Sequence, residues 1–137
     1  MAKLLTFAAF SFILLACLPG MAGQPQPQKI SLQDVLKNPS QFDGKLIQVS
    51  GFLVQEFENS GLYPDKERPL GRGIWVNTST EMSEQRDRLR NHFVVLTGVF
   101  DASRHGHLGW FKGTLTVSKC ELVRDDAPSS PGKEGKK

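Results

Sequence analysis

Cysteine is scarce in this sequence: Cys17 and Cys120 are the only two among 137 residues. Cys17 lies in an N-terminal segment that we expect to be removed or acylated, so Cys120 is left without a partner in the same chain. A disulfide framework is therefore excluded, and the fold must be held by its hydrophobic core. About 95 residues remain for the domain, which is enough for unaided folding.

Catalytic motifs are absent as well. The chain has no Gly-x-Ser-x-Gly nucleophile motif, and no Ser or Cys lies beside a recognisable base. The stretch 71–73 is too short for a phosphate-binding loop and has no helix directly behind it. We therefore expect that the protein is not an enzyme and carries no cofactor.

A strong net charge is also missing. The net charge of +3 falls to +2 when Lys3 is removed, and residues 29–123 hold 12 basic and 11 acidic side chains, a net +1. A protein that binds nucleic acid would show a clustered basic face. We therefore expect no nucleic-acid partner.

The N-terminal apolar run is too short for a membrane-spanning helix. Residues 4–18 supply about 15 apolar positions, whereas about 20 are needed to cross a bilayer. Lys3 precedes the run and Pro19 and small residues follow it, which is typical of a signal segment over residues 1–23. We therefore expect an exported protein of the periplasm or cell envelope.

Two ways of processing this segment stay open. Residues 14–17, Leu-Leu-Ala-Cys, resemble the lipobox of bacterial lipoproteins, which implies that Cys17 is acylated and becomes the first residue. Alternatively, Cys17 is only an apolar member of the signal, and cleavage follows Ala22 or Gly23. A lipid on Cys17 is the only membrane contact that the sequence predicts.

Composition divides the rest of the chain into three parts. Residues 24–28 alternate Gln and Pro and form an extended spacer. Residues 29–124 form one domain. Residues 125–137 are mostly polar, include two prolines and form a disordered tail.

The pattern within the domain predicts mostly β structure. Ser31 caps a short helix that ends before Pro39. Alternating apolar residues and turn signals predict strands at 45–57, 62–63, 73–77, 92–100 and 110–123, with a helix at 78–91. This order is that of the OB-fold, a five-stranded Greek-key barrel with a helix between strands 3 and 4. Gly51 and Gly98 predict bulges or sharp bends inside their strands.

Two stretches of the domain resemble a known group of proteins. The first runs from Asp43-Gly44-Lys45 to Glu58 and continues at Leu62-Tyr63; the second, residues 95–114, contains the block Gly-His-Leu-Gly at 106–109. Together they resemble a family of uncharacterised bacterial proteins with a short exported domain of OB type. More loosely, the chain resembles periplasmic OB-fold proteins linked to stress tolerance. The resemblance implies fold and export but no activity.

One face of the predicted barrel is a candidate binding surface. Trp75 and Tyr63 lie on neighbouring strands and, with Arg72 and Asn77, would face a small ligand or a protein partner. The sequence therefore predicts a non-catalytic binding or accessory module of the cell envelope. Because aromatic side chains on OB barrels stack on bases, a single-stranded nucleic-acid binder is an alternative. In a third interpretation Trp75 only closes one end of the barrel.

His105 and His107 support a further alternative, a metal-binding protein or metal-dependent enzyme centred on their loop. A closed zinc site uses four ligands, and only Asp101 lies near these histidines in the sequence. We therefore expect no stoichiometric metal there. We also expect Gly106, between the two histidines, to loosen the loop.

Overall fold

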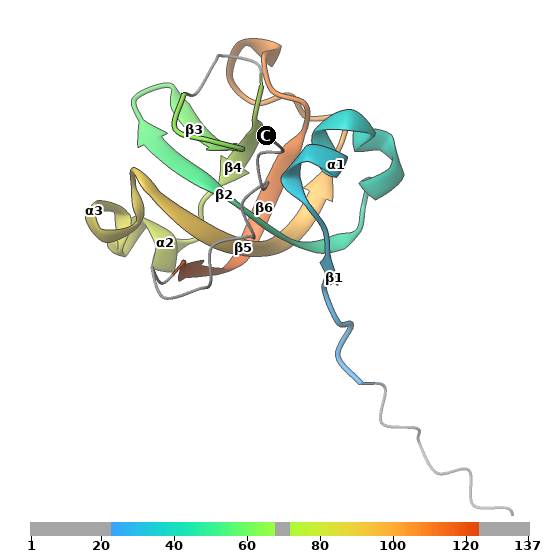
Figure 1. Cartoon of the computed structure of the whole chain (residues 1–137). Coiled ribbons are helices and arrows are strands. Elements are labelled where there is room, and N and C mark those ends of the chain that lie inside the picture. The colour runs from blue at the N-terminus through green and yellow to red at the C-terminus, as the bar shows by residue number, and fades with distance from the viewer. Residues whose placement is uncertain (1–22, 68–71, 124–137) are drawn as a thin grey trace, which may run out of the picture.

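The computed structural model describes residues 23–67 and 72–123 (Figure 1). The predicted signal segment up to Ala22, with Cys17, and the predicted tail 125–137 lie outside the described residues.

The described chain folds into a closed β-barrel. Its five strands are β2 (Leu46–Glu56), β3 (Asn59–Tyr63), β4 (Ile74–Asn77), β5 (His92–Asp101) and β6 (Thr114–Leu122). They follow the order β2-β3-β4-β6-β5, and the pairing of β5 with β2 closes the barrel. All pairs are antiparallel except β4 with β6. This is the predicted OB-type connectivity, and the fold prediction is confirmed.

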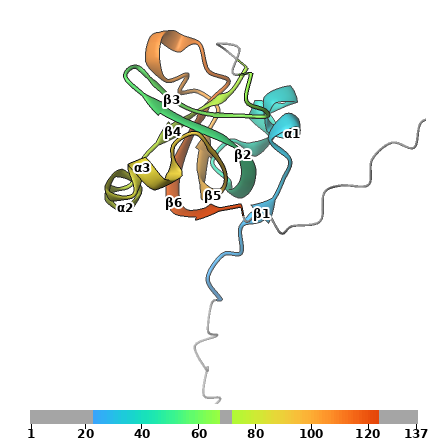
Figure 2. The same ribbon diagram turned by 60° about the vertical axis from the view of Figure 1, so that its left-hand side comes forward.

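Short elements surround the barrel. β1 (Gln28–Lys29) adds to β2 in parallel. It leads into α1 (Leu32–Lys37), which begins as predicted with Ser31 accepting a hydrogen bond from the Asp34 N–H, and into the 3-10 helix η1 (Pro39–Phe42). Figures 1 and 2 show α1 on one side of the barrel and the helices after β4 on the other.

The single helix predicted at 78–91 is wrong, because two helices occupy this segment. They are α2 (Thr80–Glu84), capped by Ser79, and α3 (Arg86–Leu89). Gln85 separates them with φ −97° and ψ 12°, outside the helical region. Only Met82 and Leu89 are buried here, so packing does not support one continuous helix.

Two predicted boundaries are also wrong. β3 begins at Asn59 rather than at Leu62, because Glu56 pairs with Asn59 and the turn consists of Phe57 and Glu58. The last strand begins at Thr114 rather than at 110. The residues before it belong to a long loop that contains the 3-10 helix η2 (His107–Gly109).

Glycine in β5 allows a close approach of two strands. The register between β5 and β6 shifts between Thr97 and Gly98, as a bulge requires, and the bulge predicted at Gly98 is confirmed. A Cβ atom there would collide with the backbone of Thr116. The register of β2 runs unbroken through Gly51, so no bulge lies there.

Two apolar clusters hold the fold. The inner cluster fills the barrel and packs against α1 and the helices after β4; its buried members include Val35, Ile47, Leu53, Ile74, Met82, Leu96, Phe100 and Leu115. The outer cluster lies on the other face of the strands and consists of Phe52, Val54, Tyr63 and Phe111, with Trp75 packed against it. Phe111 comes from the loop after β5, so this loop covers part of the outer face of the barrel.

Candidate functional site

The predicted strand face is not an open aromatic surface. Tyr63 is completely buried, and its hydroxyl donates a hydrogen bond to Asn59 Oδ1 at 2.9 Å. The prediction that Tyr63 projects onto an exposed face is therefore wrong. The reason is tertiary, because Phe111 packs near the Tyr63 ring at 6.4 Å between ring centroids.

The other three residues predicted for this face differ in exposure. Trp75 is half-buried, and its ring meets that of Phe111 edge-on at 5.1 Å between centroids. Asn77 is partly buried and Arg72 is exposed. The structure thus leaves part of Trp75 accessible and packs Phe111 against its ring.

The loop of residues 102–113, which we call the β5–β6 loop, is fixed to the strands by hydrogen bonds. The Trp75 N–H donates to the Gly113 carbonyl at 2.8 Å, and the Lys112 N–H donates to the Gly73 carbonyl at 3.1 Å. The Thr114 hydroxyl donates to the Arg104 carbonyl at 2.7 Å. These bonds hold both ends of the loop and keep it against β4.

Gly106 allows the β5–β6 loop to pack closely against Trp75. Its φ is 63° and its ψ is −154°, a combination essentially restricted to glycine. A Cβ atom at this position would lie 2.7 Å from carbon atoms of the Trp75 side chain. The expectation that Gly106 loosens the loop is therefore wrong: the missing side chain allows close contact.

The two histidines of the loop have different partners. His105 Nδ1 lies 2.9 Å from the Phe111 carbonyl, which only accepts, so Nδ1 carries the proton in this contact. His107 Nε2 lies 3.7 Å from Glu58 Oε2. Over residues 23–67 and 72–123, no group of three or more His, Cys, Asp or Glu side chains could hold a metal ion.

Asp101, the acidic residue near the histidines in sequence, is directed to Ser103. The Ser103 hydroxyl donates to Asp101 Oδ1 at 2.6 Å, and the Ser103 N–H donates to the same oxygen at 2.9 Å. These hydrogen bonds lower the pKa of Asp101. The carboxylate therefore stabilises the start of the β5–β6 loop.

Exposed apolar residues lie at the ends of two loops. The exposed fractions are 90% for Phe57 in the β2–β3 turn, 64% for Leu108 and 50% for Trp110 in the β5–β6 loop. The contact between His107 and Glu58 joins the two loops, and Figure 2 shows the loops side by side. We call Phe57, Leu108 and Trp110 the tip surface.

The tip surface was not predicted from the sequence. The signal that could have found it is the position of Leu108 and Trp110 between glycines in an otherwise polar loop. Large apolar side chains that a loop cannot bury are exposed, and clustered exposed apolar residues often mark interaction sites.

The backbone at both tips is strained. Among the described residues, three that are not glycine have a positive φ: Glu58 at 59°, Asn91 at 59° and Leu108 at 54°. Asn tolerates this left-handed conformation, whereas Glu and Leu rarely adopt it. The two unfavourable cases therefore lie in the two loops that carry the tip surface.

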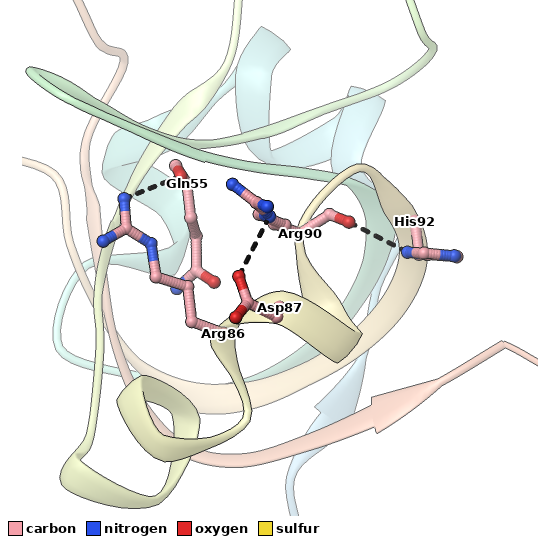
Figure 3. A network of polar contacts seen from close by, with 5 residues as sticks. All are labelled: Gln55, Arg86, Asp87, Arg90 and His92. Carbon is pink, nitrogen blue, oxygen red and sulfur yellow. Dashed lines mark hydrogen bonds and ion pairs between the residues drawn. The ribbon is translucent and has the colours of Figure 1, made fainter.

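A second polar network joins α3 to the barrel (Figure 3). Arg86 Nη2 donates to the Gln55 carbonyl at 2.9 Å, and Arg90 Nε lies 3.3 Å from Asp87 Oδ1. The Arg90 carbonyl accepts from His92 Nδ1 at 2.9 Å. The Gln55 side chain is buried, and its Oε1 has no hydrogen-bond partner among the described residues. The network braces the helix and brings no catalytic pair together.

Cys120 is a thiol with a raised pKa on β6. It is free, half-buried and packed against the inner cluster. Burial, with smaller effects of Glu121 and Glu81, raises its pKa to about 11. A thiol with this pKa is almost wholly protonated near neutral pH and is a poor nucleophile.

Comparison with solved structures supports the fold. The chain resembles the crystal structure of a DUF3299 family protein from Pseudomonas aeruginosa PAO1 with a TM-score of 0.51 and 12% sequence identity, over 73% of this chain and 98% of that one. At this identity the likeness shows the fold alone, and the family named there has no established function. No protein-family model matches the chain, and no curated protein does.

No helix in the described ranges is long and apolar enough to cross a membrane.

Proposed function

We propose that this protein is a non-catalytic binding or accessory module of the cell envelope that makes its contacts through the tip surface. The observation that carries the proposal is the exposure of Phe57, Leu108 and Trp110 on two loops that touch each other. In OB-folds, the loops between strands 1 and 2 and between strands 4 and 5 border the ligand site. The β2–β3 turn and the β5–β6 loop are the corresponding loops of this barrel.

Phe111 covers the strand face, so the tip surface is the better candidate for the site of contact. Phe111 is 3% exposed and occupies the space outside Trp75 and Tyr63. A ligand on the strands would have to displace a buried aromatic side chain. A partner at the tips meets side chains that are already exposed.

The chemistry of the nearby polar groups favours binding over catalysis. The His105 ring is held by a backbone carbonyl, and Asp101 is held by Ser103. Cys120 has a raised pKa and lies on β6, away from the tips. None of these groups forms a pair of nucleophile and base of the kind that activated nucleophiles need.

The envelope location rests on the N-terminal sequence. Either Cys17 is acylated and begins the mature chain, or cleavage occurs within residues 22–24. Intact-mass measurement of protein from membrane and soluble fractions separates these outcomes. A mature protein that retains residues 1–18 would contradict export.

Site-specific photo-crosslinking in the producing cell tests the tip surface. We expect a photoreactive phenylalanine analogue at Phe57 or at Trp110 to form adducts with a partner molecule. The matched control is the same analogue at Val99, which is 47% exposed and lies on strand β5 rather than in either loop. Equal labelling at Val99, or no adducts at the tips, would refute the proposed contact surface.

A further inference from the structure

The tip surface consists of exposed apolar residues on two neighbouring loops. Phe57 lies in the β2–β3 turn and Leu108 and Trp110 lie in the β5–β6 loop, and Figure 2 shows both loops extending beyond the strands. Small-molecule sites are concave and enclose the ligand, whereas side chains on projecting loops enter a soft surface without needing a groove. Trp is also enriched where lipid headgroups meet the hydrocarbon region.

The charge of the β5–β6 loop matches an anionic surface. The β5–β6 loop contains Arg104 and Lys112 and no acidic residue, and both side chains are exposed. Three carboxylates lie nearby: Glu56 directly precedes Phe57, Glu58 contacts His107, and Asp101 accepts hydrogen bonds from Ser103.

The cations have fewer partners than these carboxylates. Arg104 acts on Asp101 only weakly, as the last of the influences that lower the Asp101 pKa. Within the described ranges neither Arg104 nor Lys112 forms an ion pair. Residues 102–113, the loop that carries Leu108 and Trp110, thus have a net charge of +2.

The strained backbone at Leu108 supports a functional role for its exposed side chain. Its φ of 54° and ψ of 12° are those of left-handed turns, where glycine or asparagine would be more favourable. Strain of this kind persists where surrounding structure enforces it and gathers at functional sites. Here it coincides with a leucine that is 64% exposed and has no stabilising burial in return.

From this placement we propose that the tip surface docks onto an anionic lipid bilayer. Phe57, Leu108 and Trp110 enter the interfacial region, and Arg104 and Lys112 lie at the level of the lipid phosphates. The inference rests on the proposed function, because it names the occupant of the same contact surface.

Vesicle co-sedimentation tests the inference directly. The chain from Gly23 is suitable, because both apolar clusters and all strands lie within residues 28–122 and the apolar N-terminal run is absent from it. We expect it to sediment with vesicles of equal parts phosphatidylethanolamine and phosphatidylglycerol, and less with phosphatidylcholine vesicles. Replacing Arg104 and Lys112 by Gln should weaken binding to the anionic vesicles about fivefold for each charge removed.

Leu108→Asn separates membrane binding from folding. Asparagine suits the left-handed backbone, so the variant should raise the thermal midpoint by about 4 °C, while loss of the leucine weakens vesicle binding about tenfold. A variant that is more stable and binds less cannot be explained by misfolding. The matched control, Val99→Asn, changes an exposed apolar residue on strand β5, outside the tip surface, and should leave vesicle binding unchanged.

Quenching by brominated lipid locates the inserted residue. The chain contains two tryptophans, and Trp75 lies against Gly106 and Phe111 rather than at a tip. We expect quenching in the unaltered chain and little quenching in Trp110→Phe, which retains an apolar ring.

The outcomes distinguish the inference from the proposed function. Absence of vesicle binding, or equal losses in Leu108→Asn and Val99→Asn, overturns membrane docking. If crosslinks from Phe57 and Trp110 then reach only proteins, the tip surface stands as the binding site and the lipid partner is rejected. If the crosslinks fail as well, both proposals are rejected.

Discussion

Replacing Gly106 by alanine tests whether the β5–β6 loop packs against Trp75. The substitution adds a single methyl group, but this group meets two obstacles. The backbone has φ 63° and ψ −154°, and the new Cβ would lie 2.7 Å from the Trp75 side chain. The loop must therefore shift or the indole must move.

The expected loss of folding stability is the sum of a backbone cost and a packing cost. A residue other than glycine in this backbone region costs about 1–3 kcal/mol. Forcing an added carbon into a packed contact costs about 1–3 kcal/mol more. The free energy of unfolding should thus fall by about 2–6 kcal/mol, a large part of the stability of a small domain.

Gly109→Ala is the matched control in the same loop. Gly109 also has a positive φ, 71°, but no atom lies within 4 Å of its added Cβ. Its substitution should cost only the conformational term, about 1 kcal/mol. Urea unfolding followed by circular dichroism gives both values. If Gly106→Ala costs no more than Gly109→Ala, the loop is not packed on Trp75 and the covered strand face must be reconsidered.

Four further predictions concern other parts of the barrel. Phe111→Ala should lower the free energy of unfolding by about 3 kcal/mol in urea titrations, because it empties the outer cluster; a loss below about 1 kcal/mol would show that the cluster contributes little. Gln55→Met should raise it by about 1 kcal/mol, since a buried carbonyl without a partner is removed; any loss contradicts this account. Cys120 should resist alkylation at neutral pH, and stability should decline from about pH 9.0 to about 11, where the unfolded chain loses the thiol proton first; rapid alkylation of the folded chain at pH 7 would refute the raised pKa. Calorimetric titration should show no tight zinc or copper binding that depends on His105 and His107, and submicromolar binding lost on substituting both would make metal handling the leading function.

The barrel could be predicted from the sequence because its strands alternate strongly. In β2, Ile47, Val49 and Leu53 recur at every second or fourth position, and all three are buried in the inner cluster. The order of strands and the position of the helical segment then leave few topologies. Local patterns were sufficient for these features because each depends on neighbouring residues.

The turn at Phe57 and Glu58 could not be predicted in this way. Glu58 adopts a left-handed φ of 59° that sequence rules assign to glycine or asparagine, so the turn signal at Asn59 and Gly61 misplaced the strand start. The pairing of β2 with β3 stabilises the turn more than the left-handed backbone of Glu58 destabilises it.

The prediction of the candidate site was wrong for a different reason. Alternation shows that Tyr63 and Trp75 share a face but not what covers that face. The cover is Phe111, which is remote in sequence and belongs to a segment predicted as strand. The tip surface was missed because exposure of Leu108 and Trp110 depends on where the loop folds.

The closure of the barrel through β2 and β5 has a consequence for how the chain acquires its structure. β2 and β3 meet through a two-residue turn, but Leu46 pairs with Val99, 53 positions further along the chain, and Leu53 pairs with His92, 39 positions further along. Such distant pairings are slow to form, because a long loop must close before any contact is made. Until β5 is available, one edge of β2 has unpaired backbone groups beside apolar side chains, which invites pairing with other chains. A chain that ends before β5 should therefore be prone to aggregation, and the last third of the domain controls whether the first two thirds remain soluble.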